Sequence, residues 1–401
     1  MRVLMISWEY PPVIEGGLGR HVRKLSEQLA AGGVEVHVLT RGGGHLPLRE
    51  VRHGVTVHRV REPPFPRDVE RFLVWVQNMN DDMATLGPEL TSGGGFDLIH
   101  SHDWLVADAA RRISRSQRLP WLVTVHATEY GRHQGWVKAP PQSDIHALEG
   151  KMAQDADSLI TCSQYMRGHV SRVFAIQRSK ITVIPNGVDR AELVPVAAGP
   201  DGEELRARFA APDELLVLLV GRLVHEKGFH LALDALAPII RRRGKVRFVV
   251  AGSGNAEQEL KRQAKSLRID VVGTFLGWVG DDVLHSLYRA ADLCIVPSIY
   301  EPFGIVALEA MASGCLCIVA DTGGLREVVP GDESVGLRFP ARDAEALGVL
   351  LERVLEDDHE RLRLVAEARE HVLAFDWGQV ALRTRSVYDS LTPQPAVSGS
   401  V

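Results

Sequence analysis

The 401-residue sequence has no apolar run approaching the ~20 residues of a membrane-spanning helix. It also has little excess charge of one sign, since the formal net charge is −5, so nothing global points to nucleic acid. Cysteine is scarce, and the four cysteines include no C-x-x-C pair. Buried thiols acting as small apolar side chains are therefore favoured over zinc ligands or disulfides. The N-terminal apolar run stops at Ser7 and Glu9 follows, which favours a first strand over a signal peptide and predicts a cytoplasmic protein.

The composition is that of an ordinary globular protein, with 45% apolar and 24% charged residues. A chain of this length suits two domains rather than one core. Short apolar runs alternate with segments of helical period, which predicts parallel sheets covered by helices on both faces. The strands are expected at 3–7, 34–40, 55–60, 96–100, 121–126 and 158–162, then at 215–220, 246–251, 271–275, 293–297 and 316–320. A long helical region is expected at about 343–388.

Residues 190–213 interrupt the pattern with Ala, Pro, Gly and acidic side chains, which is typical of a linker and a short helix. We therefore predict an N-terminal domain at 1–190 and a C-terminal domain at 191–375. The last residues, 392–401, have little to bury, so we expect a disordered tail. The fold class predicted is α/β, with two Rossmann-like doubly wound domains.

A glycine-rich turn follows the first expected strand, Gly16-Gly17-Leu18-Gly19. Paired glycines there allow a ligand to approach the backbone, and the start of the next helix favours an anion. The turn lacks the G-x-G-x-x-G spacing and is not a Walker A loop. A simple tight turn between strand and helix is the alternative.

Two cations, Arg222 and Lys227, follow the first strand of the second half. Open α/β sheets bind ligands at the carboxyl ends of their strands, where such groups could hold a diphosphate. An ordinary solvated loop is the alternative. Further along, Glu301 lies in a loop and Glu309 on the next helix, with Gly304 to Val306 expected as the first helical turn. Its free N–H groups suit an anion, and the two carboxylates suit sugar hydroxyls.

Histidines gather near two strand ends in the first half, in His100-Ser101-His102-Asp103-Trp104 and at His126. A metal site would need three or four ligands in a suitable geometry, and we expect none. His126 could equally be a hydrogen-bonded core histidine.

Five motifs occur in order: Gly16-Gly17-Leu18, His102-Asp103-Trp104, Pro185-Asn186-Gly187-Val188-Asp189, Gly221-Arg222 with Lys227-Gly228, and Glu301 with Glu309. Together they resemble the retaining glycosyltransferases of family 4, which have the GT-B fold, from residue 1 to about 388. The opening Ser7-Trp8-Glu9-Tyr10-Pro11-Pro12 is similar to bacterial glycogen synthases. Within that branch, the chain most resembles the actinobacterial α-1,4-glucosyltransferases of glycogen and methylglucose lipopolysaccharide synthesis.

This resemblance implies two domains facing a cleft, a C-terminal helix at 376–391 that returns to the first domain, and a nucleoside diphosphate sugar as co-substrate without a further cofactor. The implied catalytic residues are His126, Asp103, Glu301, Arg222 and Lys227. The implied donor-binding residues are Gly16, Gly17, Arg222, Lys227, Gly252, Gly254, Val279, Gly304, Ile305, Val306 and Glu309. Among these, Arg222 and Lys227 bind the diphosphate, Glu309 the ribose and Glu301 the transferred sugar. The base lies near Gly252 to Gly254 and Val279, and Asp103 and His126 position the sugar.

One departure concerns the donor. Typical ADP-glucose glycogen synthases carry Lys-x-Gly-Gly-Leu, whereas this chain has Ile14 at the lysine position and Glu15 next to it. A cation near the diphosphate is therefore missing, and UDP-glucose becomes a plausible donor beside ADP-glucose. The expected reaction moves glucose to the non-reducing end of an α-1,4-glucan or related oligosaccharide.

Other functions remain open at this stage. The chain could be a mannosyl- or other hexosyltransferase acting on a lipid or small molecule, a nucleotide-sugar epimerase or hydrolase of the same fold, or a non-catalytic nucleotide-sugar binder. Arg111, Arg112, Arg115 and Arg118 form a basic segment that could contact an anionic membrane, although a solvated helix face is favoured. No nucleic-acid partner is expected, and no particular oligomeric state is predicted.

Overall fold

The computed structural model describes residues 1–13, 16–64, 66, 69–92, 95–189 and 202–392. The chain divides into two compact units, one formed by Met1–Asn186 with Trp377–Val401 and the other by Gly187–Asp376. The predicted boundary at 190 lies outside the described residues, as do Ile14, Glu15 and the predicted tail beyond Thr392.

The first unit contains an eight-stranded sheet with the order β3-β4-β2-β1-β5-β6-β7-β8. Its strands are β1 Arg2–Ile6, β2 Glu35–Gly42, β3 Arg49–Arg52, β4 Val55–Arg61, β5 Leu98–His102, β6 Trp121–Val125, β7 Ser158–Thr161 and β8 Ile181–Val183. All neighbouring strands are parallel except β3, which pairs antiparallel with β4 at the edge. Strands β5 and β6 are buried along their whole length, as expected for a sheet covered on both faces.

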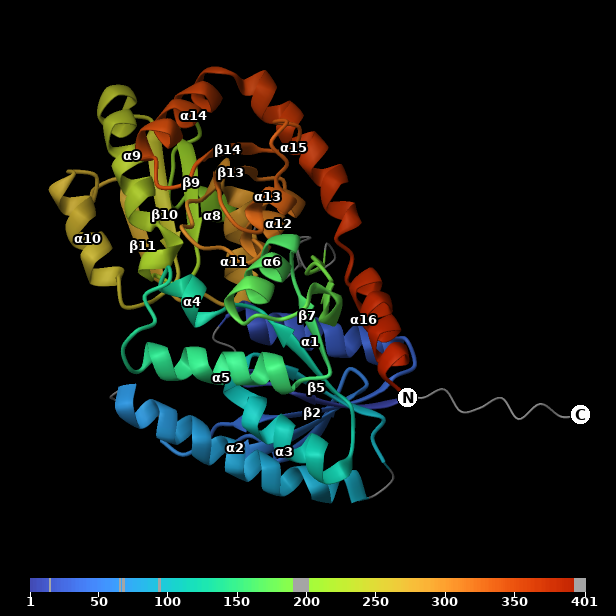
Figure 1. Ribbon diagram of the computed structural model, residues 1–401. Coiled ribbons are helices and arrows are strands. Elements are labelled where there is room, and N and C mark those ends of the chain that lie inside the picture. The colour runs from blue at the N-terminus through green and yellow to red at the C-terminus, as the bar shows by residue number, and fades with distance from the viewer. Residues whose placement is uncertain (14–15, 65, 67–68, 93–94, 190–201, 393–401) are drawn as a thin grey trace, which may run out of the picture. The chain divides into compact units, whose positions relative to one another are not determined.

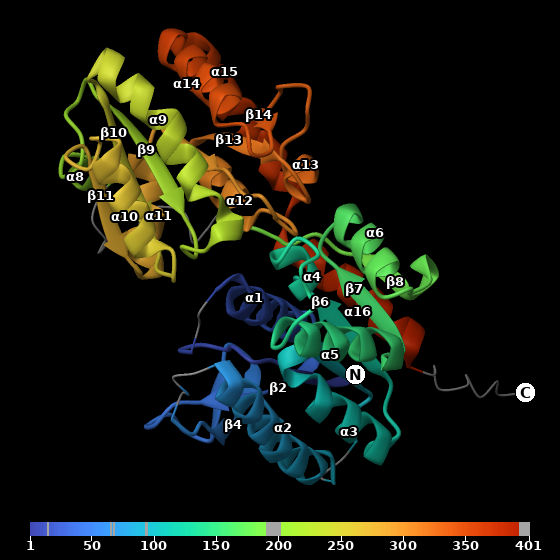
Figure 2. The same cartoon turned by 60° about the vertical axis from the view of Figure 1, so that its left-hand side comes forward.

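Helices cover both faces of this sheet. They are α1 Gly17–Ala31, α2 Val69–Ser92, α3 Ala107–Gln117, α4 Glu129–Arg132, α5 Gln142–Asp155, α6 Gln164–Val173 and α16 Trp377–Leu391, with 3₁₀ turns at Trp104–Val106 and Arg178–Lys180. The C-terminal helix α16 packs against α1, and side chains of both helices join the core on that face. Helices α2, α3 and α5 lie along the opposite face (Figures 1 and 2).

The second unit contains a six-stranded, wholly parallel sheet with the order β11-β10-β9-β12-β13-β14. Its strands are β9 Leu215–Val220, β10 Val246–Ala251, β11 Gly273–Gly277, β12 Leu293–Val296, β13 Leu316–Asp321 and β14 Leu337–Pro340. The first of these, β9, is apolar at every position because it lies in the middle of the sheet.

The helices of this unit are α8 Gly202–Arg206, α9 Phe229–Arg243, α10 Glu257–Ser266, α11 Asp281–Ala290, α12 Ile305–Ala312, α13 Leu325–Val328, α14 Ala344–Glu356 and α15 Asp358–His371, with 3₁₀ turns at His225–Lys227 and Val372–Ala374. On one face α9 contacts α10 and α14, and on the other α11 contacts α8 and α12 (Figure 1). Both units are therefore doubly wound, as the sequence predicts.

Two predicted strands begin two residues too early: β5 starts at Leu98 and β11 at Gly273. Strand β5 also ends two residues later than predicted, so His102 lies within it, and Asp103 is the first residue after the strand. The long helical region predicted for 343–388 is confirmed, and it consists of three helices and a 3₁₀ turn. The side chain of Asp357 accepts the Glu360 N–H and begins α15, and α16 starts only after another break at Trp377.

Candidate functional site

The predicted residues of the first unit lie where its sheet reverses direction. The chain leaves β1 toward β2 on one side, and it leaves β5 toward β6 on the other. Such a switch point leaves a crevice at the carboxyl ends of the strands, which is where open α/β sheets bind ligands. Gly16 and Gly17 follow β1, Asp103 follows β5, and His126 follows the neighbouring β6. The sequence prediction therefore selects residues from one edge of the sheet.

Asp103 has a strained backbone, with φ of 57° and ψ of −179°. This conformation is almost confined to glycine, and in other residues it persists where the surroundings enforce it. The Asp103 N–H donates to the Thr124 carbonyl at 3.0 Å, and its carboxylate accepts the His126 N–H at 2.7 Å. Burial raises the pKa of Asp103 to about 6. The charge of Arg132 and the N–H groups of His126 and Ala127 act in the opposite direction and lower it, but burial has the larger effect. Backbone strain and a desolvated carboxyl group both concentrate at functional sites, which makes Asp103 a candidate site residue.

We expect the charge of Asp103 to cost stability. Its pKa is raised in the folded protein, so its contribution to stability is largest at acid pH and is lost as pH rises through about 6. In urea denaturation, the gain in unfolding free energy from Asp103→Asn should be about 1.5 kcal/mol greater at pH 8 than at pH 5. The exposed control Asp82→Asn should show no such difference. An equal effect of Asp103→Asn at both pH values would contradict this prediction.

Three histidine rings meet beside Asp103. His126 Nε2 lies 3.1 Å from His102 Nδ1, and the His21 ring, on α1, lies 4.6 Å from that of His126. Burial lowers the pKa of His126 to about 4, with the charge of Arg132 adding to the effect. Burial also lowers the pKa values of His21 and His102 well below 6.5. His100 is separately satisfied, because its two ring nitrogens lie 2.7 Å from the hydroxyls of Tyr388 and Thr124.

The loop after His126 is held by buried polar groups that the sequence analysis did not select. Both carboxylate oxygens of Glu149 accept the Glu129 N–H, at 2.8 and 3.0 Å. The Thr128 hydroxyl lies 2.7 Å from His169 Nε2 and caps α4. Burial raises the pKa of Glu149 to about 8. A lone acidic residue on a helix gives no sequence signal of such a contact, because its partner is 20 residues away.

The glycine turn presents its backbone as predicted, at the start of α1. Gly17 is the first residue of that helix, and the Gly16 N–H donates to Glu9 Oε2 at 3.0 Å. The amide at this helix start therefore binds a carboxylate of the chain itself, which illustrates its suitability for an anion.

The predicted residues of the second unit also lie at a switch point, in the loops after β9 and β12. Lys227 Nζ donates to Glu301 Oε2 at 2.7 Å, and the Ser298 hydroxyl donates to the same oxygen at 3.1 Å. The Glu226 carbonyl accepts the N–H groups of Ile299 and Tyr300, at 2.8 and 3.3 Å. These bonds join the two loops, so Lys227 and Glu301, far apart in sequence, form one polar cluster.

Arg222 lies on the same loop and is half exposed, with its guanidinium 3.7 Å from Glu226. Gly228 ends the turn with φ of +68°, and a Cβ there would lie 2.0 Å from the Pro297 carbonyl oxygen. Only glycine therefore lets the β9 loop approach the β12 loop this closely.

Helix α12 begins at Ile305, with Gly304 as its N-cap at φ of +116°. The sequence analysis placed Gly304 inside the first turn, so the helix starts one residue later than predicted. Its first N–H groups, including those of Ile305 and Val306, have no acceptor within the helix and can bind an anion. Glu309, one turn further, is mostly buried and accepts the Tyr288 hydroxyl at 2.9 Å.

The residues predicted near the base lie after β10 and β11. A Cβ on Gly252 or Gly254 would lie 1.8 or 2.3 Å from carbonyl oxygens of the β9 loop, at Gly221 and Leu223. This packing explains why both positions are glycine, whatever they bind. Val279 is partly exposed in the segment between β11 and α11.

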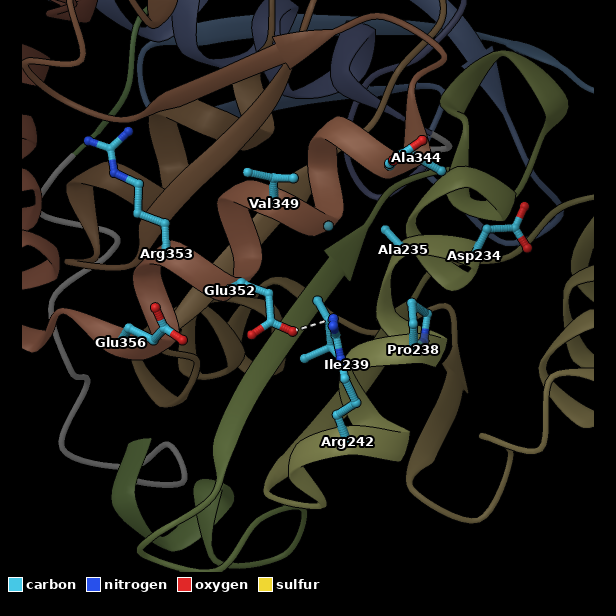
Figure 3. A pocket seen from close by; sticks show the side chains of 12 residues that line it. Asp234, Ala235, Pro238, Ile239, Arg242, Ala344, Val349, Glu352, Arg353 and Glu356 are labelled. Carbon is cyan, nitrogen blue, oxygen red and sulfur yellow. Dashed lines mark hydrogen bonds and ion pairs between the residues drawn. The ribbon is translucent and has the colours of Figure 1, made fainter.

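A pocket of about 680 Å³ lies elsewhere in this unit, between α9 and α14 (Figure 3). Figure 3 shows the Arg242–Glu352 ion pair among the side chains that line it. None of the predicted site residues lines this pocket, and we assign it no role.

The basic segment of the first unit lies on and just after α3. Arg111 and Arg112 pair with Asp108, Arg112 also with Asp81, and Arg115 with Asp155. These pairs favour a solvated helix face over a membrane-binding surface. Among the described residues, no helix combines the length and apolar character needed to cross a membrane.

Two known families match the chain in sequence. Residues 15–192 match Glycosyltransferase Family 4, and residues 201–371 match Glycosyl transferases group 1. Glycogen synthase of Mycobacterium tuberculosis is 38% identical, over 97% of this chain and 94% of that protein. D-inositol 3-phosphate glycosyltransferase of Frankia alni is 34% identical, over 94% and 95%. Among solved structures, sucrose-phosphate synthase from Thermosynechococcus elongatus is 28% identical and superposes with a TM-score of 0.82, over 97% of this chain and 98% of that one.

Proposed function

The chain belongs to glycosyltransferase family 4 and is a glycosyltransferase of the GT-B fold, and from that premise we propose that it transfers glucose, with retention, from a nucleoside diphosphate glucose to an α-1,4-glucan. The observation that carries this proposal is the 38% identity to a glycogen synthase over nearly the whole chain. The Lys227–Glu301 pair and the nearby Arg222, in the loops at the switch point of the second unit, support it, because they suit a sugar diphosphate.

The proposed roles follow from charge and position. The leaving diphosphate gains negative charge in the transition state, and Arg222, Lys227 and the first N–H groups of α12 stabilise it. The acceptor attacks the anomeric carbon on the face that the phosphate leaves, and the phosphate takes the acceptor's proton. The chain itself supplies the positive charge, so we assign no metal to this step.

The remaining residues hold the two ends of the donor. Glu301 binds hydroxyls of the transferred sugar, and Glu309 binds the ribose. Asp103 and His126 position the sugar from the first unit, with the base beside Gly252, Gly254 and Val279. The strain at Asp103 supports this assignment, because strained residues concentrate at functional sites.

A product assay tests the proposed function. The protein is incubated with ADP-glucose, UDP-glucose or GDP-mannose, each with and without a maltooligosaccharide, and the products are identified. We expect an elongated glucan from a glucose donor. A parallel incubation with D-inositol 3-phosphate tests the activity named for the Frankia relative. Transfer to that acceptor alone, or epimerisation of the donor without glucan extension, would overturn the proposal.

We predict that UDP-glucose is used at least comparably to ADP-glucose. Ile14 replaces the lysine of dedicated ADP-glucose enzymes, and Glu15 adds negative charge. Both donors share the diphosphate, so the lost cation does not itself select a base, but it removes one feature of the ADP-glucose enzymes. The check is kcat/KM for both donors at one maltooligosaccharide concentration. An ADP-glucose preference above ~100-fold, about 2.7 kcal/mol, would refute the prediction.

A further inference from the structure

The three histidines beside Asp103 form a cluster of possible metal ligands within the first unit. One ring nitrogen from each of His21, His102 and His126 lies within 4.8 Å of the other two. The three residues come from α1, the end of β5 and the loop after β6, so the sheet and its first helix fix their backbones. His21 and His102 are 4% and 0% exposed, whereas His126 is partly exposed. The cluster is therefore buried on one side and accessible on the other.

One nitrogen of this cluster, His21 Nε2, is buried, has no hydrogen-bond partner and is free to bind an ion. Unsatisfied buried polar atoms are rare in native proteins and often mark a bound water or ion. The other nitrogen of His21, Nδ1, lies 2.8 Å from the Asn186 Oδ1 atom. An N–H held in this way orients an imidazole so that its opposite nitrogen faces a metal ion, as in many known sites.

We propose that His21, His102 and His126 bind one divalent transition-metal ion, with Zn²⁺ as the best-suited candidate. Zinc takes neutral imidazoles at 2.0–2.1 Å in a tetrahedral arrangement, which places ligand nitrogens about 3.3 Å apart. His102 Nδ1 and His126 Nε2 are already 3.1 Å apart. The metal takes the place of the proton between His102 Nδ1 and His126 Nε2. The histidine that carried this proton then carries it on its other ring nitrogen, so both imidazoles stay neutral. His21 Nε2 is the third ligand, and water completes the site.

The charges around the cluster allow a cation. Arg132 is the nearby positive group, and it lies 3.8 Å from the carboxylate of Glu129. The Asp103 carboxylate contacts the His126 backbone and supplies negative charge on the same side. Because the proposed function assigns His126 to the sugar, a metal held there blocks that role. The metal is therefore an inhibitor rather than a cofactor, and this consequence alone rests on the proposed function.

Binding is measured without reference to activity, by titrating the whole protein with Co²⁺ and recording the visible absorption of a tetrahedral complex. Zn²⁺ should then displace Co²⁺ at one equivalent per chain. Asn186→Ala should weaken binding about 10–100-fold, the usual loss when an orienting partner is removed. His21→Gln should abolish the spectrum. Should His21→Gln fail to fold, the partly exposed His126→Gln provides the same readout.

The control is His225→Gln, an exposed histidine of the second unit whose ring stacks on that of His230. It should bind Co²⁺ as the unaltered protein does. A spectrum that persists in a folded His21→Gln or His126→Gln variant, one lost in His225→Gln, or no stoichiometric binding at all would overturn the metal site.

A separate experiment measures the effect of metal ions on turnover. EDTA should leave turnover unchanged or raise it, and Zn²⁺ should lower it at the concentration that fills the site. Stoichiometric binding without inhibition leaves the metal site intact and contradicts the role of His126 in the reaction. Loss of activity in EDTA that added Mg²⁺ or Mn²⁺ restores would instead contradict the assignment of the metal as an inhibitor.

Discussion

Replacing Lys227 with alanine should lower kcat about 10²–10³-fold, the loss typical of removing one preorganised group that stabilises developing charge. Lys227 is held against Glu301 at 2.7 Å, so its ammonium group is fixed before any ligand binds. The variant should remain folded, because the Ser298 hydroxyl still donates to Glu301 and the bonds from Ile299 and Tyr300 to Glu226 use only backbone atoms. Arg222→Ala should have a similar effect on kcat with no effect on folding, since Arg222 is half exposed.

A matched control separates this effect from the loss of any lysine–glutamate pair. Lys261 forms such a pair with Glu257 in the same unit, also at 2.7 Å, but on α10. Lys261→Ala should leave kcat within about twofold of the unaltered protein, because its charge is not placed to stabilise the leaving group. Steady-state kinetics and melting curves of the three variants are the measurement. Near-normal turnover in both Lys227→Ala and Arg222→Ala, with unchanged melting, would remove the diphosphate assignment.

The sequence predicts the fold well where burial is continuous. The strand β9 lies at 215–220 as predicted, because an unbroken apolar run in the middle of a parallel sheet has little freedom to shift. At the edges the pattern is weaker. Val271 was assigned to a strand because its side chain is apolar. It is nevertheless 82% exposed, and β11 begins two residues later. The short strands β3, β8 and β14 are not continuously buried and lack the apolar run that reveals the equally short β7 and β12.

Some residues of the candidate site could likewise be predicted from the sequence, and others could not. Residues in loops directly after strands, such as Asp103 and Lys227, could be found because parallel strands bring their carboxyl ends to one edge. His21 could not, since it lies within a helix and its partner Asn186 is 165 residues away. The strain at Asp103 was also hidden, because a backbone angle is set by the surrounding structure rather than by residue type. Sequence therefore locates the edge of each sheet, and packing determines which polar groups meet there.

Replacing Gly252 with alanine should destabilise the second unit by more than about 3 kcal/mol. Gly252 has φ of +145°, a conformation that side chains disfavour, and its Cβ would lie 1.8 Å from the Gly221 carbonyl oxygen. That oxygen belongs to the backbone, so no side-chain rotation relieves the clash. The loops after β9 and β10 must separate, which breaks the bond from the Gly221 N–H to the Ala251 carbonyl. Arg222 is the next residue, so kcat should fall as well.

The comparison is Gly280→Ala, at the N-cap of α11. That residue has φ of −68°, which any residue adopts, and no atom lies within 4 Å of the added Cβ. The Gly280→Ala variant should melt at a temperature close to that of the unaltered protein. Gly252→Ala should lower the melting temperature by roughly 6–12 °C, because a loss of about 3 kcal/mol corresponds to about 2–4 °C per kcal/mol in a unit of this size. Equal melting of the two variants would mean that the β9 and β10 loops can separate at little cost. Arg222 would then be held less rigidly than its role as a preorganised charge requires.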